Sequence, residues 1–465
     1  MSTAAAAVQA GVASVLQLAF PSFPSHNALR ALDLMQQLAA SQRFEPQRLA
    51  RLQAASLRAL MAHAGRHSEF WRERLGGAGA LLPEDATAAR LLASVEPLHR
   101  HDVQERRDAM RAMFPGRERL APVMVTTSGS SGVPVKVEKT KLVQLPLYSA
   151  CLLLFYASAG FDPERRTGLL RSRLQDRESF TLGAPFTWLF ERDPPAFSLT
   201  TRGRSAAELY PLVASLRPNY LACGPTTARR LAEHALATGA GDLRADACFT
   251  VGSTVTPETR EIVREGLGAR IWDCYSTEET GWIAIQCPRH DHYHVVSPLV
   301  LVEIVDGDGR PCAPGEVGSV LVTPLHSYAM PLIRYEVGDL AQWGRDCDCG
   351  IRWPVISNIV GRTRHLIAHP DGTRSYPRIY AREFARVPGL REYRLTLHSD
   401  RVVVAQLLMA RPPTETQRAQ IVDLVQRAMG YPYPVTLRQV DAIDWGGSGK
   451  QDDFAVSPEP SGAGN

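Results

Sequence analysis

The chain has 465 residues, which is too long for one ordinary domain and fits a large domain followed by a smaller one. Its 52 basic and 48 acidic residues leave a net charge of +4, an excess too small and too dispersed to indicate binding to nucleic acid or to an anionic membrane. No apolar run reaches the roughly 18 uninterrupted residues of a membrane span, and residues 1–20 lack the basic start of a secretory signal. We therefore expect a cytoplasmic protein whose eight cysteines do not form a disulfide framework.

The first elements in chain order are helices, predicted within residues 26–110 because leucines recur near helical spacing over 26–75. From about residue 120, short apolar runs alternate with segments of helical pattern. Two strand-then-helix pairs are predicted at 219–223 with 226–237 and at 247–251 with 257–266. This alternation indicates α/β architecture, and residues 296–323 add further strands around an Asp-Gly-Asp-Gly turn.

A new pattern begins after Gly361. Strands are predicted at 392–398, 401–409 and 435–440, and an amphipathic helix at 414–429. A segment of this length can form an independent α+β domain. We therefore predict three parts: a large N-terminal domain (1–361), a small C-terminal domain (362–454) and a disordered tail rich in Pro, Ser and Gly (455–465).

The first motif that indicates chemistry is a loop rich in hydroxyl groups and glycine, TTSGSSGVP at residues 126–134. Such loops present backbone N–H groups and hydroxyls to phosphate oxygens, and glycine lets the backbone approach closely. The loop is not a Walker motif, because no Gly-Lys-Ser/Thr follows at the required spacing. A flexible surface turn would have a similar composition.

Four further signals follow along the chain. Thr277 and Glu278 come after a strand-like run and could hold a phosphate and its Mg²⁺, although a capped helix start uses the same residue types. Asp339 ends an apolar run and could accept both hydroxyls of a ribose, or be an ordinary turn aspartate. The last two are the segments GRTR at 361–364 and SGK at 448–450.

In their order and spacing, these five motifs resemble the core motifs of the adenylate-forming (acyl-CoA synthetase) superfamily over residues 120–454. The segments CYSTEE (274–279), MPLIRY (330–335) and GD (338–339) are most similar to its phenylacetate–CoA ligase branch. The resemblance implies an α/β fold, with a large N-terminal domain of mixed sheets flanked by helices and a small mobile C-terminal α+β domain. It also implies ATP-dependent activation of a carboxylic acid as an acyl-adenylate, then transfer to CoA with release of AMP and pyrophosphate.

The resemblance also assigns roles to single residues. Lys450 would bridge the attacking carboxylate and the α-phosphate, Thr277 would contact that phosphate, and Glu278 would hold Mg²⁺. ATP would be bound by the loop residues Ser128, Gly129, Ser130, Ser131 and Gly132, by Gly252, Ser253 and Thr254 beside the adenine, by Tyr275 and Ser276, and by Asp339 with Arg362 at the ribose. The hinge between the domains would be Arg364, where many relatives have Asp or Lys, and Tyr275 stands where many have Gly.

Cysteine and histidine residues indicate a second kind of site. Cys287 precedes three histidines in alternate positions, and a Cys-x-Cys-Gly segment follows at Cys347 and Cys349. Four such ligands suit a closed tetrahedral zinc site, which is structural because no position is left for water. Reduced thiols with histidines at an active-site rim are the alternative, and the family likeness selects Cys287, His294, Cys347 and Cys349 as the zinc ligands.

The acyl acceptor and the acid are not determined by the motifs. No CoA-binding signature is evident, so transfer to a carrier-protein thiol or to an amine stays open beside CoA. A non-catalytic nucleotide-binding scaffold is a third possibility, against which the retained Thr277, Glu278, Asp339 and Lys450 argue. Aromatic residues within 180–197 either line an apolar acyl pocket or belong to the core: Phe180, Phe186, Trp188, Phe190 and Phe197. An aryl or arylacetic acid is implied by the resemblance alone.

Overall fold

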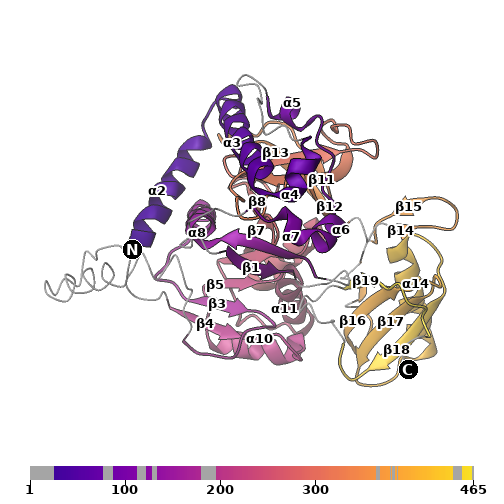
Figure 1. Cartoon of the computed structure of the whole chain (residues 1–465). Coiled ribbons are helices and arrows are strands. Elements are labelled where there is room, and N and C mark those ends of the chain that lie inside the picture. The colour runs from indigo at the N-terminus through magenta and orange to yellow at the C-terminus, as the bar shows by residue number, and fades with distance from the viewer. Residues whose placement is uncertain are drawn as a thin grey trace, which may run out of the picture.

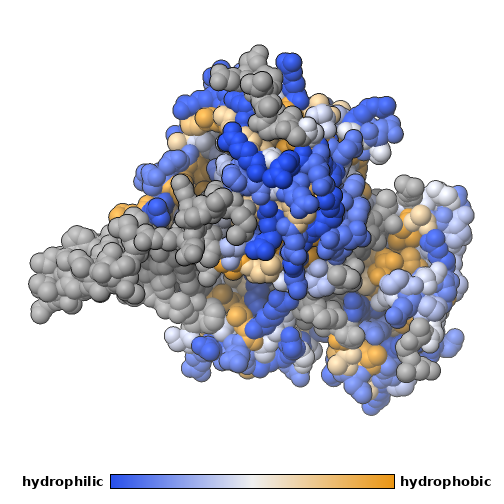
Figure 2. Space-filling view, viewed as in Figure 1, coloured by the Kyte–Doolittle hydropathy of each residue, from blue (hydrophilic) through white to orange (hydrophobic). Residues whose placement is uncertain are grey.

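The chain folds into a large body and a smaller C-terminal body, which lies at the right in Figure 1. The computed structural model describes residues 26–76, 87–112, 122–127, 134–179, 195–362, 367–377, 379, 383–384, 386–443 and 453–462. Within this described part no helix is long and apolar enough to cross a membrane. Hydrophilic residues dominate the face shown in Figure 2, with hydrophobic residues scattered among them.

An eleven-stranded sheet organises the large body, in the order β10-β11-β12-β13-β9-β8-β7-β6-β5-β3-β4. One half is parallel: β3 (Thr167–Leu170), β4 (Ala196–Leu199), β5 (Tyr220–Cys223), β6 (Ala247–Val251) and β7 (Arg270–Thr277). The other half is antiparallel: β8 (Gly281–Gln286), β9 (Tyr293–Val295), β10 (Val300–Val305), β11 (Val317–Pro324), β12 (Tyr335–Trp343) and β13 (Val355–Arg362). The change of direction after β7 matters for function, because ligands of open α/β sheets bind where parallel strands end.

Helices cover both faces of the parallel half, which explains why β4 and β5 are buried along their whole length. On one face lie α10 (Ala206–Ser215), α11 (Pro225–Thr238) and α12 (Pro257–Leu267), and on the other α2 (His26–Ser41) and α8 (Lys141–Ser158). Local sequence sets the ends of α12: the Thr256 hydroxyl accepts from Thr259 N, Pro257 opens the helix, and Gly268 ends it with φ 70°.

The antiparallel half packs on the N-terminal helices. These are α3 (Pro46–His67), α4 (Glu69–Arg74), α5 (Ala88–Leu92), α6 (Arg100–Glu105) and α7 (Arg107–Met110). Trp71 is fully buried there, and its indole Nε1 donates to Pro331 O at 2.9 Å. A separate hairpin of β1 (Pro122–Thr126) and β2 (Lys136–Thr140) carries the hydroxyl-rich loop at its tip.

The small body has its own sheet and its own core. Its elements are β14 (Ile367–Ala368), β15 (Arg374–Ser375), β16 (Leu390–Leu397), β17 (Val403–Met409), α14 (Glu415–Met429), β18 (Val435–Val440) and β19 (Phe454–Val456). The main sheet has the order β18-β17-β16-β19, and its Leu395 and Leu407 are fully buried in one core with Ile421 of α14. The predicted tail began at residue 455, yet Val456 still pairs with Leu397 in this sheet.

Candidate active site

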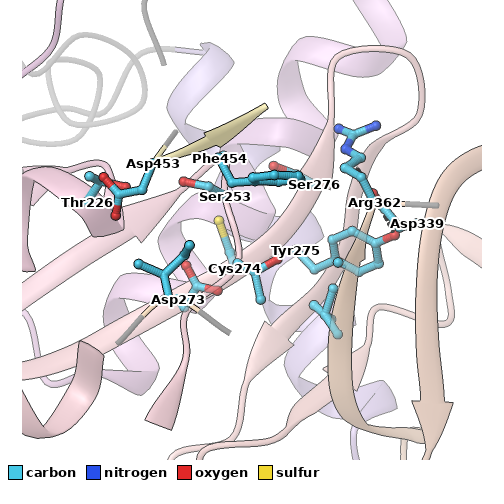
Figure 3. Close-up of a pocket in the computed structure, with 15 residues that line it drawn as sticks. Thr226, Ser253, Asp273, Cys274, Tyr275, Ser276, Asp339, Arg362, Asp453 and Phe454 are labelled. Carbon is cyan, nitrogen blue, oxygen red and sulfur yellow. Dashed lines mark hydrogen bonds and ion pairs between the residues drawn. The ribbon is translucent and has the colours of Figure 1, made fainter. Parts of the chain in front are cut away.

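A cavity of about 230 Å³ lies where β6 and β7 end and where the small body meets the large one (Figure 3). Its wall combines segments that are far apart in the sequence. The residues predicted for the nucleotide that line it are Gly252, Ser253, Thr254, Tyr275, Ser276, Asp339 and Arg362. The small body contributes Ile379, Asp453 and Phe454 to the same wall. The fold therefore brings much of the predicted nucleotide site together.

Asp339 is the best-defined polar group of this cavity. It is buried on β12, and β13 pairs it with Arg362, whose Nε lies 3.0 Å from Asp339 Oδ1. The Tyr275 hydroxyl donates to Asp339 Oδ2 at 2.7 Å, as Figure 3 shows. Burial and the nearby Asp339 carboxylate raise the pKa of Tyr275 well above its usual value, so the phenol stays a donor. A carboxylate has about four lone-pair sites on its two oxygens, so it can accept hydrogen bonds from several donors at once.

The turn between β7 and β8 holds the residues predicted to contact phosphate and metal. Thr277 Oγ1 accepts from Thr280 N at 3.0 Å and lies 2.9 Å from the Thr280 hydroxyl, so it caps a tight turn rather than a helix. Glu278 is exposed. The neighbouring Glu279 points inward, with Oε1 3.4 Å from the Tyr335 hydroxyl and 3.7 Å from an Arg100 guanidinium nitrogen.

Several predicted site residues lie outside the described residues: Ser128, Gly129, Ser130, Ser131, Gly132, Arg364 and Lys450. The neck of the hydroxyl-rich loop is described, and it is closed by hydrogen bonds in both directions. Thr127 N donates to Val135 O, and Val135 N donates to Thr127 Oγ1, both at 2.9 Å. Thr127 and Val135, which flank the loop in the sequence, are therefore paired with each other.

Ion pairs join the small body to α11 beside the first cavity, and the sequence did not indicate them. Arg229 and Arg230 both contact the carboxylate of Asp453, with Arg230 Nη2 3.1 Å from Oδ1. Arg230 Nη1 also lies 3.5 Å from Glu392 Oε2, and Arg229 Nη1 lies 2.6 Å from Glu233 Oε1. The sequence signal was the adjacent Arg-Arg pair, which taken alone resembles any exposed helix face.

A second cavity, of about 250 Å³, lies on the other side of the β7–β8 turn. Its apolar wall is built from β1, α8, β8 and the start of β10: Val123, Val125, Leu145, Leu147, Trp282, Leu299 and Val300. Thr280 and Gly281 line this cavity while Tyr275 and Ser276 line the first, so one turn separates the two. Gln144 Oε1 and Trp282 Nε1 are buried on its wall and have no hydrogen-bond partner among the described residues.

The aromatic segment proposed for the acyl wall is only partly described. Residues 180–194 lie outside the described part, and Phe197 of β4 is fully buried in the core. The described acyl-sized cavity draws its aromatic residues from elsewhere, namely Tyr148 and Trp282, whose ring centroids are 5.7 Å apart.

The four predicted metal ligands are gathered in one place. The ligand atoms of Cys287, His294, Cys347 and Cys349 lie within 4.8 Å of one another. Cys287 Sγ is 3.8 Å from Cys347 Sγ, and a tetrahedral ion with Zn–S bonds of about 2.3 Å separates its sulfurs by about 3.8 Å. Cys349 Sγ is 3.3 Å from His294 Nε2, while His294 Nδ1 lies 3.1 Å from Trp353 O and can donate to it. That second contact orients the imidazole so that Nε2 faces the thiols.

The remaining histidines of this segment lie beside the four. His290 Nε2 is 2.6 Å from an Asp348 carboxylate oxygen, and His292 Nε2 is 3.2 Å from Cys347 Sγ. His292 can thus donate to a thiolate of Cys347. The residues present fit a closed Cys₃His site with supporting hydrogen bonds around it.

No protein-family model matches the chain. Among curated proteins it is similar to the phenylacetate–coenzyme A ligase of Thermus thermophilus, with 27% identity over 334 residues that cover 69% of this chain and 72% of that enzyme. Among solved structures it is similar to 2-hydroxyisobutyryl-CoA ligase in the postadenylation state in complex with 2-HIB-AMP, with a TM-score of 0.66, 19% identity and 89% of both chains covered. The same ligase with 2-HIB-AMP and CoA in the thioesterification state gives a TM-score of 0.58 at 18% identity, covering 89% of this chain and 91% of that one.

These similarities confirm the predicted fold class and the predicted family likeness. The large mixed sheet with flanking helices, followed by a small α+β body, is the architecture that this chain shares with the CoA ligase structure over 89% of its length. The similarity to the phenylacetate–coenzyme A ligase covers more than two thirds of both chains.

Proposed function

We propose that this chain, a homologue of phenylacetate–CoA ligase with the fold of the adenylate-forming CoA ligases, activates a carboxylic acid with ATP and transfers the acyl group to CoA. The observation that carries the proposal is the pair of adjoining cavities, one polar and one apolar, separated by the β7–β8 turn. An acid bound in the apolar cavity would present its carboxylate to a nucleotide in the polar one.

The polar cavity supplies a site for the adenosine. Asp339 would accept from the ribose hydroxyls, and Arg362 would keep that carboxylate ionised and oriented through its 3.0 Å contact. The segment Gly252, Ser253 and Thr254 would pass beside the adenine, and Tyr275 would fix the second oxygen of Asp339. The loop at 128–132 would hold the β- and γ-phosphates through backbone N–H groups.

The chemical step joins two anions, since a carboxylate oxygen attacks the α-phosphorus of ATP and pyrophosphate leaves. Neither partner must lose a proton, so the residues act through charge and position rather than as a general base. Lys450 would lie between the attacking carboxylate and the α-phosphate, and Thr277 would donate to that phosphate. A bound Mg²⁺ supplies charge neutralisation at the phosphates, and a carboxylate of the β7–β8 turn, Glu278 in the sequence prediction, would hold it.

The small body would deliver Lys450 and then move away. Asp453, which follows Lys450 by three residues in the sequence, lines the first cavity, and this supports the proposed role of the lysine. We place the domain boundary at residues 361–362 with the hinge at Arg364. After adenylation, rotation of the small domain would open a path for the CoA thiol, which attacks the acyl carbon and releases AMP.

We further propose a structural zinc ion held by Cys287, His294, Cys347 and Cys349. Its role would be to tie the end of β8 and β9 to the loop before β13, which are distant in sequence. No catalytic step depends on this ion.

A pyrophosphate-release screen with a panel of carboxylic acids, each with and without CoA, tests the proposed function. The expected result is release that requires both ATP and one class of acid, with AMP and an acyl-CoA thioester formed once CoA is present. Acid-dependent release without thioester formation would instead favour a carrier-protein or amine acceptor. No acid-dependent release from any compound of the panel would contradict the proposal.

A further inference from the structure

A carboxylic acid enters its site as an anion, yet the second cavity is mostly apolar. Moving a carboxylate from water into such a place is costly unless a positive group meets it. Lys450 belongs to the small domain, so it is in place only in one domain arrangement. The large domain therefore needs a cation of its own if the acid is to bind in a defined pose before the domains close.

Lys139 is such a cation. It lies on β2 opposite Val123 of β1, and both residues line the second cavity. Burial lowers the pKa of Lys139, while the charges of Glu278 and Glu279 act in the opposite direction. Within the described part of the chain no hydrogen bond or ion pair is recorded for the ammonium, although the charges of Glu278 and Glu279 act on it. Thr280 and Gly281, which follow these two glutamates in the β7–β8 turn, line the same cavity as Lys139.

The other basic side chain on the described wall does not compete for this role. His326 Nε2 lies 3.2 Å from Pro298 O, and burial lowers the pKa of His326, so the ring is neutral near pH 7. Lys139 is therefore the basic side chain of this described wall that can meet a substrate carboxylate.

Lysine is rare in this chain: only four of its 52 basic residues are lysines, at positions 136, 139, 141 and 450, and the rest are arginines. An ammonium is a compact point charge, whereas a guanidinium is larger and fixes its partners in a planar fork. The two lysines with proposed contacts to the acid would then approach the carboxylate from different domains.

We infer that Lys139 is the large domain's counter-ion for the substrate carboxylate, a positioning residue that holds this group at the junction of the two cavities until Lys450 arrives. The inference rests on the proposed function. It implies that acids bind to this enzyme before domain closure, and that uncharged analogues of the same shape bind without help from Lys139.

The experiment compares the charged acid with its neutral analogue in matched variants. The probes are phenylacetate and phenylacetamide, or the acid that gives the fastest pyrophosphate release in the screen above and its primary amide. The variants are Lys139→Met and Lys139→Arg, with Lys136→Met as control, because Lys136 is exposed on the same strand. Calorimetry measures binding of each probe without ATP, and pyrophosphate release measures KM and kcat.

We expect Lys139→Met to weaken binding of the acid, and to raise its KM, about 10- to 100-fold, while binding of the amide and the KM for ATP change less than about twofold. Lys139→Arg should recover part of the acid affinity, and Lys136→Met should resemble the wild type. Equal weakening of acid and amide in Lys139→Met would overturn the inference, since that pattern marks a structural role. Unchanged acid binding would overturn it as well. If the wild-type protein binds the acid but releases no pyrophosphate, the proposed function is refuted. The calorimetric comparison of acid and amide then still decides whether Lys139 pairs with the carboxylate.

Discussion

Removal of the Asp453 charge should loosen the small body from the large one without unfolding either. Arg229 and Arg230 of α11 converge on this carboxylate, and the three side chains are only 7%, 9% and 13% exposed. In Asp453→Asn, the guanidinium groups of Arg229 and Arg230 would lose the carboxylate that they share, so their mutual repulsion would be less compensated. Because undocking returns them to water, the cost should appear in the docking equilibrium rather than in folding stability.

The size of the effect follows from the contacts that remain. Removing one partner of a buried, hydrogen-bonded ion pair costs about 2–5 kcal/mol. Arg229 would keep Glu233 at 2.6 Å, and Arg230 would keep Glu392 at 3.5 Å, so the lower end applies. About 2 kcal/mol corresponds to a roughly 30-fold shift toward the undocked arrangement.

The two half-reactions report on this shift separately. Pyrophosphate release with acid and ATP measures adenylation, which should slow in Asp453→Asn, whereas formation of acyl-CoA from synthetic acyl-adenylate should keep its wild-type rate. Hydrogen exchange of the α11 amides should rise in the variant. The control is Asp423→Asn, which breaks an exposed ion pair with Arg427 in the same domain and should change neither rate, because exposed pairs contribute less than about 1 kcal/mol.

The reasoning is refuted if Asp453→Asn adenylates at the wild-type rate with unchanged α11 protection, or if both half-reactions slow equally. The first result would mean that the ion pairs do not hold the small body in place. The second would mean that the substitution damages a site shared by both steps.

Other predictions concern the nucleotide and metal sites. Asp339→Ala should raise the KM for ATP about 100-fold, because it removes the ribose acceptor, and Tyr275→Phe should raise it about tenfold, because Asp339 then loses one charge-assisted hydrogen bond. Steady-state kinetics at saturating acid measures both KM values. Equal KM values in the two variants would contradict the assigned order. Glu278→Gln should raise the Mg²⁺ concentration needed for half-maximal adenylation more than Glu279→Gln does. Glu279→Gln should mainly lower stability, because Glu279 contacts Tyr335 and Arg100. The reverse pattern in a Mg²⁺ titration would move the metal role to Glu279. Purified protein should contain about one equivalent of zinc, and Cys349→Ser should lose it and lower the melting temperature; less than about a tenth of an equivalent in the wild type would end the zinc proposal.

The sequence predicted those strands and helices whose apolar residues follow a regular pattern within a short segment. The strand at 219–223 and the helix at 226–237 correspond to β5 and α11, since a short apolar run and an amphipathic period each leave a direct trace. The helix predicted at 414–429 corresponds to α14, whose start is fixed by a capping box of Thr414 and Gln417 and whose end is marked by Gly430.

Contacts between distant segments were not predictable in the same way. The second cavity joins β1, α8, β8 and β10, and only the sheet order brings them together. The aromatic run at 180–197 was compatible with either an acyl wall or the core, and Phe197 is a core residue. The family resemblance selected Cys287, His294, Cys347 and Cys349, whose ligand atoms lie within 4.8 Å of one another, whereas Asp453 looked like any acidic residue near a chain end.

The transfer of oxygen from the acid to the nucleotide gives the most direct test of adenylation. The acid is labelled with ¹⁸O in its carboxylate, the reaction is run to completion with ATP and CoA, and the products are analysed by mass spectrometry. Attack of the carboxylate on the α-phosphorus leaves one ¹⁸O atom in AMP and none in pyrophosphate. AMP without ¹⁸O, or label in pyrophosphate or inorganic phosphate, would show that no acyl-adenylate forms and that the two cavities serve another reaction.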